Sequence, residues 1–478
     1  MTERIEADIV VIGAGAAGLS VAAGASQMGA SVVLFEKGVM GGDCLNVGCV
    51  PSKALLAAGH AAESVRQAAR YGVDASIDAV DWSRVSDHVK GAIATIAPLD
   101  SVERYEGLGV RVIQAEARFT GPREITGGGV TVTAKYIVLA TGSRPAVPPI
   151  PGLSDAPYLT NESVFDLPAC PQHLIVLGGG PIGCELAQAH ARLGAKVTLI
   201  EAQTLLGNDD PEAAKIVRRA LISEGIDLRE GTKATAVAGS EEHKIAVTVE
   251  GPDGMDTVSG SHLLVAVGRT VSFDGLDLDA GNVGVGERGA LRLDAQLRSN
   301  TNSRVFAVGD AAGGMQFTHV AGSHASTLIK KLLFKLPAPA ITPDQVPRVT
   351  YTAPELAQIG PTEIVLREKR VRFEVLRWGL AENDRATAEA DREGFVKLLI
   401  APNGRILGAT LVGTGVGETL SVLVLAISKK MEVGDIAPLV VPYPTRAEIV
   451  KRAAGSWYVP KLFSDRTKCI VRFLMRFS

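Results

Sequence analysis

The sequence lacks most of the features that mark secreted, membrane-spanning and nucleic-acid-binding proteins. Five cysteines among 478 residues are too few for the disulfide framework of a small secreted domain. The net charge of −3 gives no global reason to expect nucleic-acid binding. Residues 1–7 are polar, and the one long apolar run, residues 9–25, is interrupted by glycines at the spacing of a phosphate-binding turn. We therefore expect a cytoplasmic protein.

The composition is that of a globular α/β protein with several domains. Hydrophobic residues make up 46% of the chain and charged residues 21%. A chain of 478 residues is too long for one ordinary core, and its length predicts about three domains.

A repeat is the most informative internal feature. Residues 8–36 and residues 174–201 each read as an apolar strand, a G-x-G-x-x-G turn, a helix and a second apolar strand closed by glutamate. The repeated positions are Gly13, Gly15, Gly18 and Glu36 in the first copy, and Gly178, Gly180, Gly183 and Glu201 in the second. One such turn is weak evidence, but two copies in the same context predict two dinucleotide-binding units.

Each position of the repeat has a separate physical role. The first glycine allows the tight turn, the second lets the backbone approach a pyrophosphate, and the third lets the helix pack on the strand. The amides at the helix N-terminus then face the phosphates. Glu36 and Glu201 are placed to accept hydrogen bonds from ribose hydroxyls. Because a carboxylate disfavours a 2′-phosphate, the second unit is expected to prefer NADH over NADPH.

The remaining segments predict further elements around the two units. Residues 50–105 read as mostly helical, and the proline-rich residues 147–152 read as a linker. Residues 301–314 read as a strand that ends in Asp310. From about residue 347 the pattern changes to strands at 371–377 and 394–413, the latter broken by an Asn-Gly hairpin turn, and a helix at about 416–430. This last part reads as an α+β domain.

Residues 41–53, GGDCLNVGCVPSK, carry the candidate redox chemistry. Cys44 and Cys49 lie close in sequence just before a predicted helix, whose N-terminal dipole lowers a thiol pKa and stabilises the thiolate. Metal binding is the main rival interpretation. Two cysteines alone do not fill a zinc site and no matching second pair exists, so we expect a redox-active disulfide and no resident metal.

This segment resembles the active-site disulfide of the pyridine nucleotide-disulfide oxidoreductases, the family of dihydrolipoamide dehydrogenase, glutathione reductase and mercuric reductase. The resemblance covers nearly the whole chain, because the ATG motif at 140–142 and the motif at 307–310 also fall in family order. It implies an α/β fold with two Rossmann-like dinucleotide-binding domains, for FAD and NAD, and a C-terminal α+β interface domain. It also implies a homodimer with a shared active site.

Domain boundaries and site residues follow from the resemblance. The expected domains are FAD-binding segments at 1–152 and 272–345, an NAD(H)-binding domain at 153–271 and an interface domain at 346–478. The residues implied for FAD are Gly13, Gly15, Gly18, Glu36, Gly42, Lys53, Thr141, Gly142 and Asp310. Those implied for NADH are Gly178, Gly180, Gly183, Glu201 and Gly268.

The family also implies catalytic roles for the redox segment. Lys53 is expected near flavin N5, and Glu185 is expected to pair with Lys53 and to border the nicotinamide. Electrons would pass from NADH through the flavin to the disulfide. Cys49 would be the charge-transfer thiol, and Cys44 would engage the substrate.

The sequence departs from the family at the proton-shuttling site. The family motif H-P-x-x-x-E is matched here by Tyr443 to Glu448, with tyrosine in place of histidine, and all eight histidines lie at or before His324. A phenol with a pKa of about 10 is a poor proton shuttle at neutral pH, so ordinary dithiol–disulfide turnover is expected to be slow. Mercuric reductase has a tyrosine at this position, which favours a metal ion as acceptor.

Two further differences bear on the acceptor. Asp43 stands where the family usually has threonine, and we expect its carboxylate to raise the pKa of Cys44 and to attract cations. Mercuric reductases end in a vicinal cysteine pair and usually begin with a metal-binding domain; here Cys469 stands alone. The leading hypothesis is a reductase of a thiophilic metal ion or an unusual disulfide. Dihydrolipoamide dehydrogenase with Tyr443 in the catalytic position and a membrane-associated redox sensor remain as alternatives.

The C-terminal segment has an amphipathic pattern. In residues 465–477 a helix would place Lys468, Arg472 and Arg476 on one stripe and Ile470, Phe473, Leu474 and Phe477 opposite. Residues 461–478 would then make a peripheral contact with an anionic membrane, or would pack on the dimer partner or the FAD domain.

Overall fold

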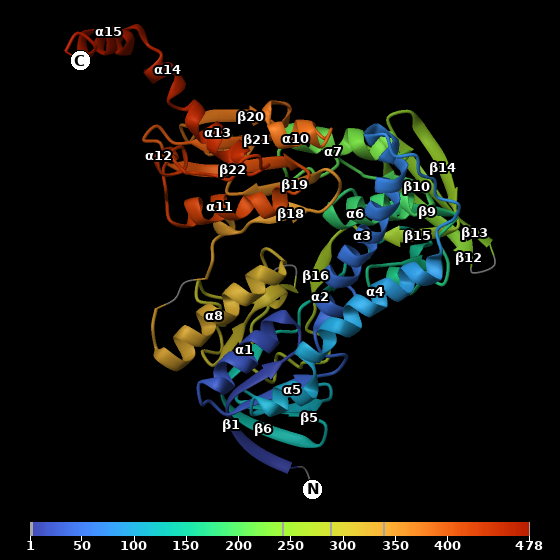
Figure 1. The fold of residues 1–478 in the computed structure, drawn as a ribbon. Coiled ribbons are helices and arrows are strands. Elements are labelled where there is room, and N and C mark those ends of the chain that lie inside the picture. Colours follow the sequence, from blue (N-terminus) through green and yellow to red (C-terminus); the bar gives the residue numbers. More distant parts are fainter. Residues whose placement is uncertain (1–2, 241–242, 287–288, 338–339, 478) are drawn as a thin grey trace.

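A computed structural model describes residues 3–240, 243–286, 289–337 and 340–477. Residues 1–2 of the predicted FAD-binding segment and residue 478 of the predicted interface domain lie outside the described residues. The chain folds into three regions of mixed helix and sheet, which confirms the predicted fold class (Figure 1). Blue and gold elements form the region at the bottom of the view, green elements the region at the right, and orange and red elements the region at the top.

A seven-stranded sheet is the core of the first region, with the strand order β3-β2-β1-β6-β5-β4 and β17 paired to β6. Its strands are β1 (Glu3–Ile12), β2 (Val32–Glu36), β3 (Val110–Gln114), β4 (Arg118–Gly121), β5 (Glu124–Gly127), β6 (Val130–Leu139) and β17 (Val305–Ala307). The central strands are parallel and buried, as their continuous apolar sequences predict. Helices α1 (Ala16–Gln27) and α8 (Thr318–Phe334) contribute to the core on one face.

The predicted helical stretch between the two repeats is confirmed. Residues 50–105 hold α3 (Cys49–Arg66), α4 (Trp82–Ile96) and the start of α5 (Val102–Gly107), and α2 (Gly42–Asn46) lies just before them. Helix α3 leaves the first region and packs on a helix of the second, α6 (Pro181–Arg192), through Leu55, Leu56 and Leu186. This contact fixes the segment that carries Cys44 and Cys49 relative to the second copy of the repeat.

The second region is built on a parallel sheet with the order β11-β10-β9-β15-β8. Its elements are β8 (Tyr158–Leu159), β9 (His173–Leu177), β10 (Lys196–Ile200), α7 (Pro211–Ser223), β11 (Asp227–Arg229) and β15 (His262–Val265). An antiparallel sheet of β12 (Lys233–Ser240), β13 (His243–Gly251) and β14 (Gly254–Gly260) packs beside it. A two-stranded ribbon of β7 (Ser143–Pro145) and β16 (Arg269–Val271) marks where the chain enters and leaves this region.

The C-terminal region is an antiparallel five-stranded sheet covered by helices, as its alternation of strands and helix predicts. Its strands are β18 (Arg348–Thr350), β19 (Glu355–Ile359), β20 (Glu374–Gly379), β21 (Phe395–Ile400) and β22 (Ile406–Gly413). Its helices are α9 (Glu363–Glu368), α10 (Asp384–Ala388), α11 (Val416–Ser428), α12 (Val433–Ile436) and α13 (Glu448–Ser456). Helices α14 (Val459–Leu462) and α15 (Asp465–Leu474) follow and point away from the body (Figure 1).

Two predicted boundaries are wrong by a few residues. The strand predicted at 371–377 lies at β20, because residues 371–373 still belong to the loop after α9. The strand predicted to end in Asp310 ends at Ala307, and Asp310 lies in a 3-10 turn, Gly309–Ala312, where Gly309 has a φ of 62°. In the described parts of the chain, no helix has the length and apolar character needed to cross a bilayer.

Candidate active site

A cavity of about 1450 Å³ lies where the three regions meet. It is larger than the roughly 300–1,000 Å³ typical of small-molecule sites, and therefore has room for a dinucleotide. The predicted site residues in its wall are Gly13, Gly15, Glu36, Gly42, Cys44, Cys49, Lys53, Thr141, Gly142, Glu185 and Asp310. The predicted residues outside its wall are Gly18, Gly178, Gly180, Gly183, Glu201, Gly268, Tyr443 and Glu448.

The first glycine turn is closed to side chains at two positions and open toward the cavity at the third. A Cβ on Gly13 would lie 2.4 Å from the Ala140 carbonyl oxygen, and one on Gly18 would lie 1.9 Å from the Gly13 carbonyl oxygen, so both positions are closed to side chains. Gly15 is different, because a Cβ there would meet only Gly42 Cα at 3.9 Å. Gly15 lines the cavity, and because it has no side chain, a ligand in the cavity can approach its backbone closely. Such close approach is what binding of a phosphate requires. These residues fit FAD.

Glu36 is held at the end of β2 in the position expected of a ribose-binding acid. Its two carboxylate oxygens accept hydrogen bonds from the backbone N–H groups of Ala14 at 2.6 Å and Gly38 at 2.7 Å. The carboxylate is thereby fixed beside the glycine turn. Each oxygen keeps a lone pair for a further donor.

The second glycine turn repeats this geometry outside the cavity. A Cβ on Gly183 would lie 1.9 Å from the Gly178 carbonyl oxygen, whereas Gly180 has nothing within 4 Å. Glu201 accepts hydrogen bonds from the backbone N–H groups of Gly179 at 2.7 Å and Gln203 at 2.8 Å. The two turns therefore present the same donor and acceptor arrangement, and the residues of the second fit a nicotinamide dinucleotide.

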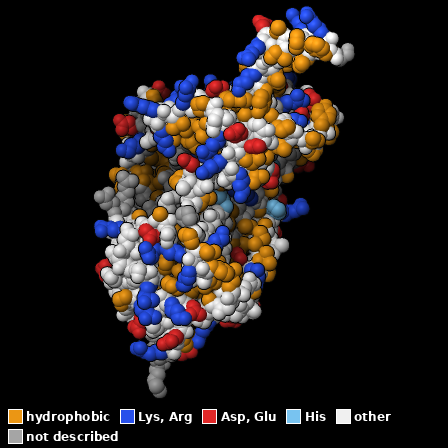
Figure 2. Space-filling view, turned by 90° about the vertical axis from the view of Figure 1, so that its left-hand side faces the viewer, with side chains coloured by type: hydrophobic (Ala, Val, Ile, Leu, Met, Phe, Trp, Pro, Cys, Tyr) orange, Lys and Arg blue, Asp and Glu red, His pale blue; other side chains and the backbone are white. Residues whose placement is uncertain are grey.

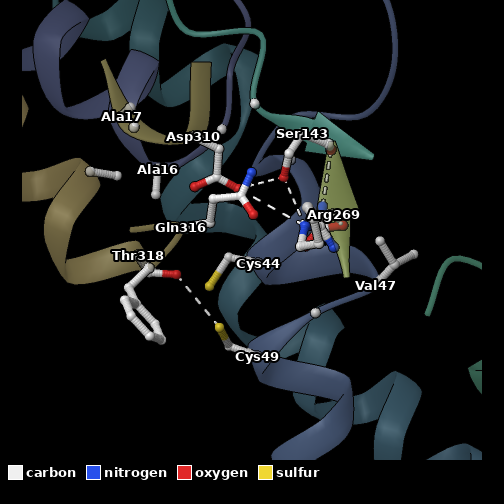
Figure 3. A pocket seen from close by; sticks show the side chains of 18 of the residues that line it. Ala16, Ala17, Cys44, Val47, Cys49, Ser143, Arg269, Asp310, Gln316 and Thr318 are labelled. Carbon is white, nitrogen blue, oxygen red and sulfur yellow. Dashed lines mark hydrogen bonds and ion pairs between the residues drawn. The ribbon is translucent and has the colours of Figure 1, made fainter. Parts of the chain in front are cut away.

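The two cysteines come from successive helices. Cys44 lies within the five-residue helix α2, and Cys49 is the first residue of α3. Both are free thiols in this structure. Figure 3 shows both of them close to Thr318, whose hydroxyl oxygen lies 3.5 Å from the Cys49 sulfur.

The surroundings of the two thiols shift their pKa values in opposite directions. A hydrogen bond from the Cys44 thiol, together with Thr318 and the charge of Lys53, lowers the pKa of Cys49 to about 6. The same hydrogen bond and burial raise the pKa of Cys44 well above its ordinary value. At neutral pH, Cys49 is therefore the thiolate and Cys44 holds the proton.

Lys53 and Glu185 form an ion pair across the interface of α3 and α6. The Lys53 Nζ lies 2.8 Å from a Glu185 carboxylate oxygen, and the other carboxylate oxygen accepts from the Tyr351 backbone N–H at 2.9 Å. Only 5% of Glu185 is exposed, so the Lys53 ammonium is the partner of a buried carboxylate. Lys53 also lies 4.4 Å from the centre of the Tyr351 ring. The Lys53 ammonium group, which comes from the first region, thus contacts one residue of the second region and one of the C-terminal region.

A polar network next to the cysteines contains residues that the sequence did not reveal. Arg269 donates to the Ser143 hydroxyl at 2.7 Å and to its carbonyl at 2.9 Å, and the Ser143 hydroxyl donates to Asp310 at 2.6 Å (Figure 3). Burial raises the pKa of Asp310. Arg269 directly follows the predicted Gly268, and Ser143 directly follows the predicted Gly142, so adjacency to the motifs is the signal that could have found both.

Asp43 belongs to this network, which corrects the role expected for it. Its carboxylate pairs with Arg269 at 3.1 Å and accepts from the Asn161 side-chain amide at 3.1 Å. Its charge is therefore already compensated. The largest influences on the pKa of Cys44 are Cys49, burial and Thr318, whereas Asp43 acts to raise the pKa of Cys49. Asp43 ties the redox loop to the ribbon at β16.

Tyr443 and Glu448 lie on the surface of the C-terminal region. Tyr443 is 69% exposed and donates to a carboxylate oxygen of Asp384 at 2.9 Å, a hydrogen bond that raises the pKa of the phenol. Glu448 accepts from Arg452 at 2.9 Å. In a single chain, therefore, neither side chain reaches the cysteines.

His319 and His324 both have structural partners. His319 lines the cavity, but its Nε2 hydrogen-bonds to the Pro347 carbonyl at 2.8 Å and burial lowers its pKa. His324 accepts from the Gly309 backbone N–H at 3.2 Å. Nowhere in the described ranges do three or more histidine, cysteine, aspartate or glutamate side chains gather as a metal site.

Comparison with known proteins identifies the family. Residues 7–325 match the pyridine nucleotide-disulphide oxidoreductase family, and residues 346–454 match its dimerisation domain. A mercuric reductase of Streptomyces lividans is 36% identical over 94% of this chain and 96% of its own. A dihydrolipoyl dehydrogenase of Chlorobaculum tepidum is 34% identical, with the same coverage of both chains.

Solved structures agree. LpdA from Mycobacterium tuberculosis has a TM-score of 0.85 at 26% identity and covers 95% of this chain and 99% of its own. The Cu(II) complex of RclA, an HOCl-induced flavoprotein disulfide reductase from Escherichia coli, has a TM-score of 0.82 at 25% identity and covers 93% of this chain and 99% of its own.

The expected FAD and pyridine nucleotide dependence follows from the family, and its dimerisation domain supports a homodimer. The chain belongs to the pyridine nucleotide-disulphide oxidoreductases and is a pyridine nucleotide-dependent flavoprotein disulfide reductase.

Proposed function

We propose that this enzyme uses NADH to reduce a thiophilic metal ion through Cys44 and Cys49. The observation that carries the proposal is the absence of an imidazole at the family's proton-shuttling position, which Tyr443 occupies. Its phenol is bound to Asp384, and its pKa is raised above the ordinary value of about 10. It therefore neither accepts nor releases a proton readily at neutral pH.

Proton balance favours a metal acceptor. Two-electron reduction of a disulfide by NADH consumes one proton and yields two thiols, so a disulfide reductase has to deliver protons to sulfur. Reduction of one Hg(II) to Hg(0), or of two Cu(II) to Cu(I), by NADH releases one proton and protonates no product. A site without a titrating shuttle is therefore less impaired with a metal ion than with a disulfide.

The chain supplies a pair of sulfur ligands suited to this task. Cys49 is the thiolate at neutral pH, and Cys44 would release its proton to solvent when a soft metal ion binds both sulfurs. We assign the substrate-facing role to Cys44 and the cofactor-facing role to Cys49. Because only two cysteines are present at the cavity, the metal is a transient substrate and not a structural component.

Residues already described would hold the cofactors. Gly13, Gly15 and Glu36 would bind the pyrophosphate and adenosine of FAD, with Asp310 at its ribityl region and Lys53 near its ring. When bound, FAD supplies the two-electron chemistry that links a nicotinamide to a disulfide. The Lys53–Glu185 pair would border the nicotinamide.

NADH is proposed as the electron donor. Two backbone amides anchor Glu201, and its carboxylate would repel a 2′-phosphate on a nucleotide bound at this turn. Residues 202–208, which follow it, contain no lysine or arginine to bind such a phosphate. Electrostatics at this point therefore disfavour NADPH.

We further propose that the homodimer completes the active site. Tyr443 is exposed in one chain and belongs to the dimerisation domain that the family comparison identifies. In the homodimer, this surface would face the cavity of the second chain. Glu448 would support it there through the first turn of α13.

A disulfide acceptor is the second candidate. The 34% identity to a dihydrolipoyl dehydrogenase favours it, and water would then replace the missing imidazole. The mercuric reductase relatives, and a Cu(II) complex in a structural neighbour, favour the metal ion instead.

An acceptor panel separates the two candidates. NADH oxidation is measured anaerobically with Hg(II), Cu(II), oxidised lipoamide or no acceptor, and Cys44→Ser is the matched control. We expect metal-dependent turnover that requires Cys44 and exceeds lipoamide turnover. Faster turnover with lipoamide, or metal-dependent oxidation that survives in Cys44→Ser, would contradict the proposal.

A further inference from the structure

The C-terminal tail, residues 459–477, stands apart from the common fold of the family. The dimerisation-domain match ends at residue 454, before the tail begins. Helices α14 and α15 project from the C-terminal region on the side away from the first sheet (Figure 1). No residue of either helix is buried within the chain. Within one chain, the tail therefore does not pack on the FAD-binding region. Of the two packing partners that the sequence left open, the dimer partner remains.

One face of α15 and the turn after it is apolar and open. Ile470 is 49% exposed, Phe473 56%, Leu474 59% and Phe477 75%. The rings of Phe473 and Phe477 pack edge to face at 5.1 Å, which joins them into one surface. Val459 at 47% and Phe463 at 68% extend the exposed apolar area toward α13. Such a surface costs free energy in water unless something covers it.

The other face is basic. Lys468, Arg472 and Arg476 follow one another at four-residue spacing and form a stripe opposite the apolar face. Lys461 and Arg466 bring the tail's cations to five, whereas Asp465 is its only acid and is paired with Lys468 at 3.3 Å. Figure 2 shows orange and blue side chains next to each other on this projection at the top of the molecule. The charge of the tail is thus opposite to that of the whole chain, which is −3.

We infer that the tail binds the surface of an anionic phospholipid bilayer. The apolar face would enter the headgroup and acyl boundary while the basic stripe meets the phosphates, the arrangement that an amphipathic helix adopts in an interface. Neither the apolar face nor the basic face alone identifies a bilayer as the binding partner. A protein groove would match the apolar face but not the excess of cations, whereas an anionic bilayer matches both.

The homodimer strengthens such an attachment. A helix of ten residues offers limited apolar area and binds a bilayer weakly by itself. Two tails on one dimer make the second contact intramolecular, which increases the overall affinity without new contacts. The inference does not depend on which acceptor the enzyme uses.

Vesicle flotation of the full-length holoprotein tests the inference. We expect the protein to float with vesicles of phosphatidylglycerol and phosphatidylcholine, to stay behind with phosphatidylcholine alone, and to be released by 0.5 M salt. Each basic side chain near an anionic surface increases binding by a factor of about five. Loss of three such charges lowers the partition constant by about 100-fold, and the triple variant Lys468→Glu, Arg472→Glu, Arg476→Glu, which also reverses them, should lower it by about 100-fold or more.

Matched variants separate lipid binding from general charge and from dimer packing. Lys215→Glu, Lys330→Glu, Lys369→Glu changes exposed lysines elsewhere by the same total charge and should float like the parent. Phe473→Ser, Phe477→Ser should weaken binding while FAD content and dimer mass are unchanged. The inference is overturned if the parent protein does not float, or if both charge variants lose binding equally. It is also overturned if deletion of residues 459–478 dissociates the dimer and leaves flotation intact, because the tail would then pack on the second chain.

Discussion

The hydrogen bond between the two cysteines makes a quantitative prediction about Cys49. The Cys44 thiol is the largest cause of the lowered pKa of Cys49, which is about 6. At pH 7 such a thiol is about 90% thiolate, whereas a thiol with the ordinary pKa of about 8.5 is about 3% thiolate. Cys44→Ala removes the donor and should raise the pKa of Cys49, whereas Cys44→Ser keeps a donor and should raise it less.

Alkylation of the reduced protein measures this difference. Rates at Cys49 are followed by peptide mass spectrometry between pH 4 and pH 10, so that the exposed Cys469 does not contribute. Because only the thiolate reacts, the parent rate should be half-maximal near pH 6 and fall below it. At pH 7 the alanine variant should react several-fold more slowly than the serine variant. A parent midpoint near pH 8.5, or equal midpoints in the two variants, would refute the reasoning.

Three further changes test other parts of the site. Glu185→Gln leaves Lys53 without its charged partner and should lower kcat with NADH by at least 10-fold while FAD content stays constant, as stopped-flow reduction and absorbance would show. Glu201→Ala should improve kcat/KM for NADPH relative to NADH by 10-fold or more, measured in steady state; an unchanged ratio would dismiss the role of this acid. Tyr443→His should increase lipoamide turnover by at least 10-fold with a new pH dependence near 6.5, and no increase would remove the proton-shuttle argument.

Local patterns made the geometry of the two glycine turns predictable. Gly13 and Gly18 are required because of contacts with residues nearby in sequence or with the end of the adjacent strand. The same holds for Gly178 and Gly183. Strand and helix periodicities also predicted the elements on both sides. The amphipathic tail helix was predictable for the same reason, since its pattern is contained in its own sequence.

Contacts between distant segments explain what the sequence left open. Arg269 joins Asp43, Asn161 and Ser143, three segments that only the folded chain brings together. No periodicity encodes such a meeting point, so the compensation of Asp43 could not be foreseen. The Lys53–Glu185 pair spans 132 residues and was expected only through the family resemblance. Whether the tail packs on the first region was likewise decided by the structure.

An anaerobic titration with NADH tests the central claim, that electrons from the nicotinamide reach Cys44 and Cys49. The oxidised holoprotein is treated with one equivalent of NADH, and new thiols are alkylated and located by mass spectrometry. The account predicts a gain of two thiols per chain, both in the peptide that contains residues 44–49, and none in Cys44→Ser. Oxidation of NADH without thiol gain, or with new thiols elsewhere in the chain, would contradict it.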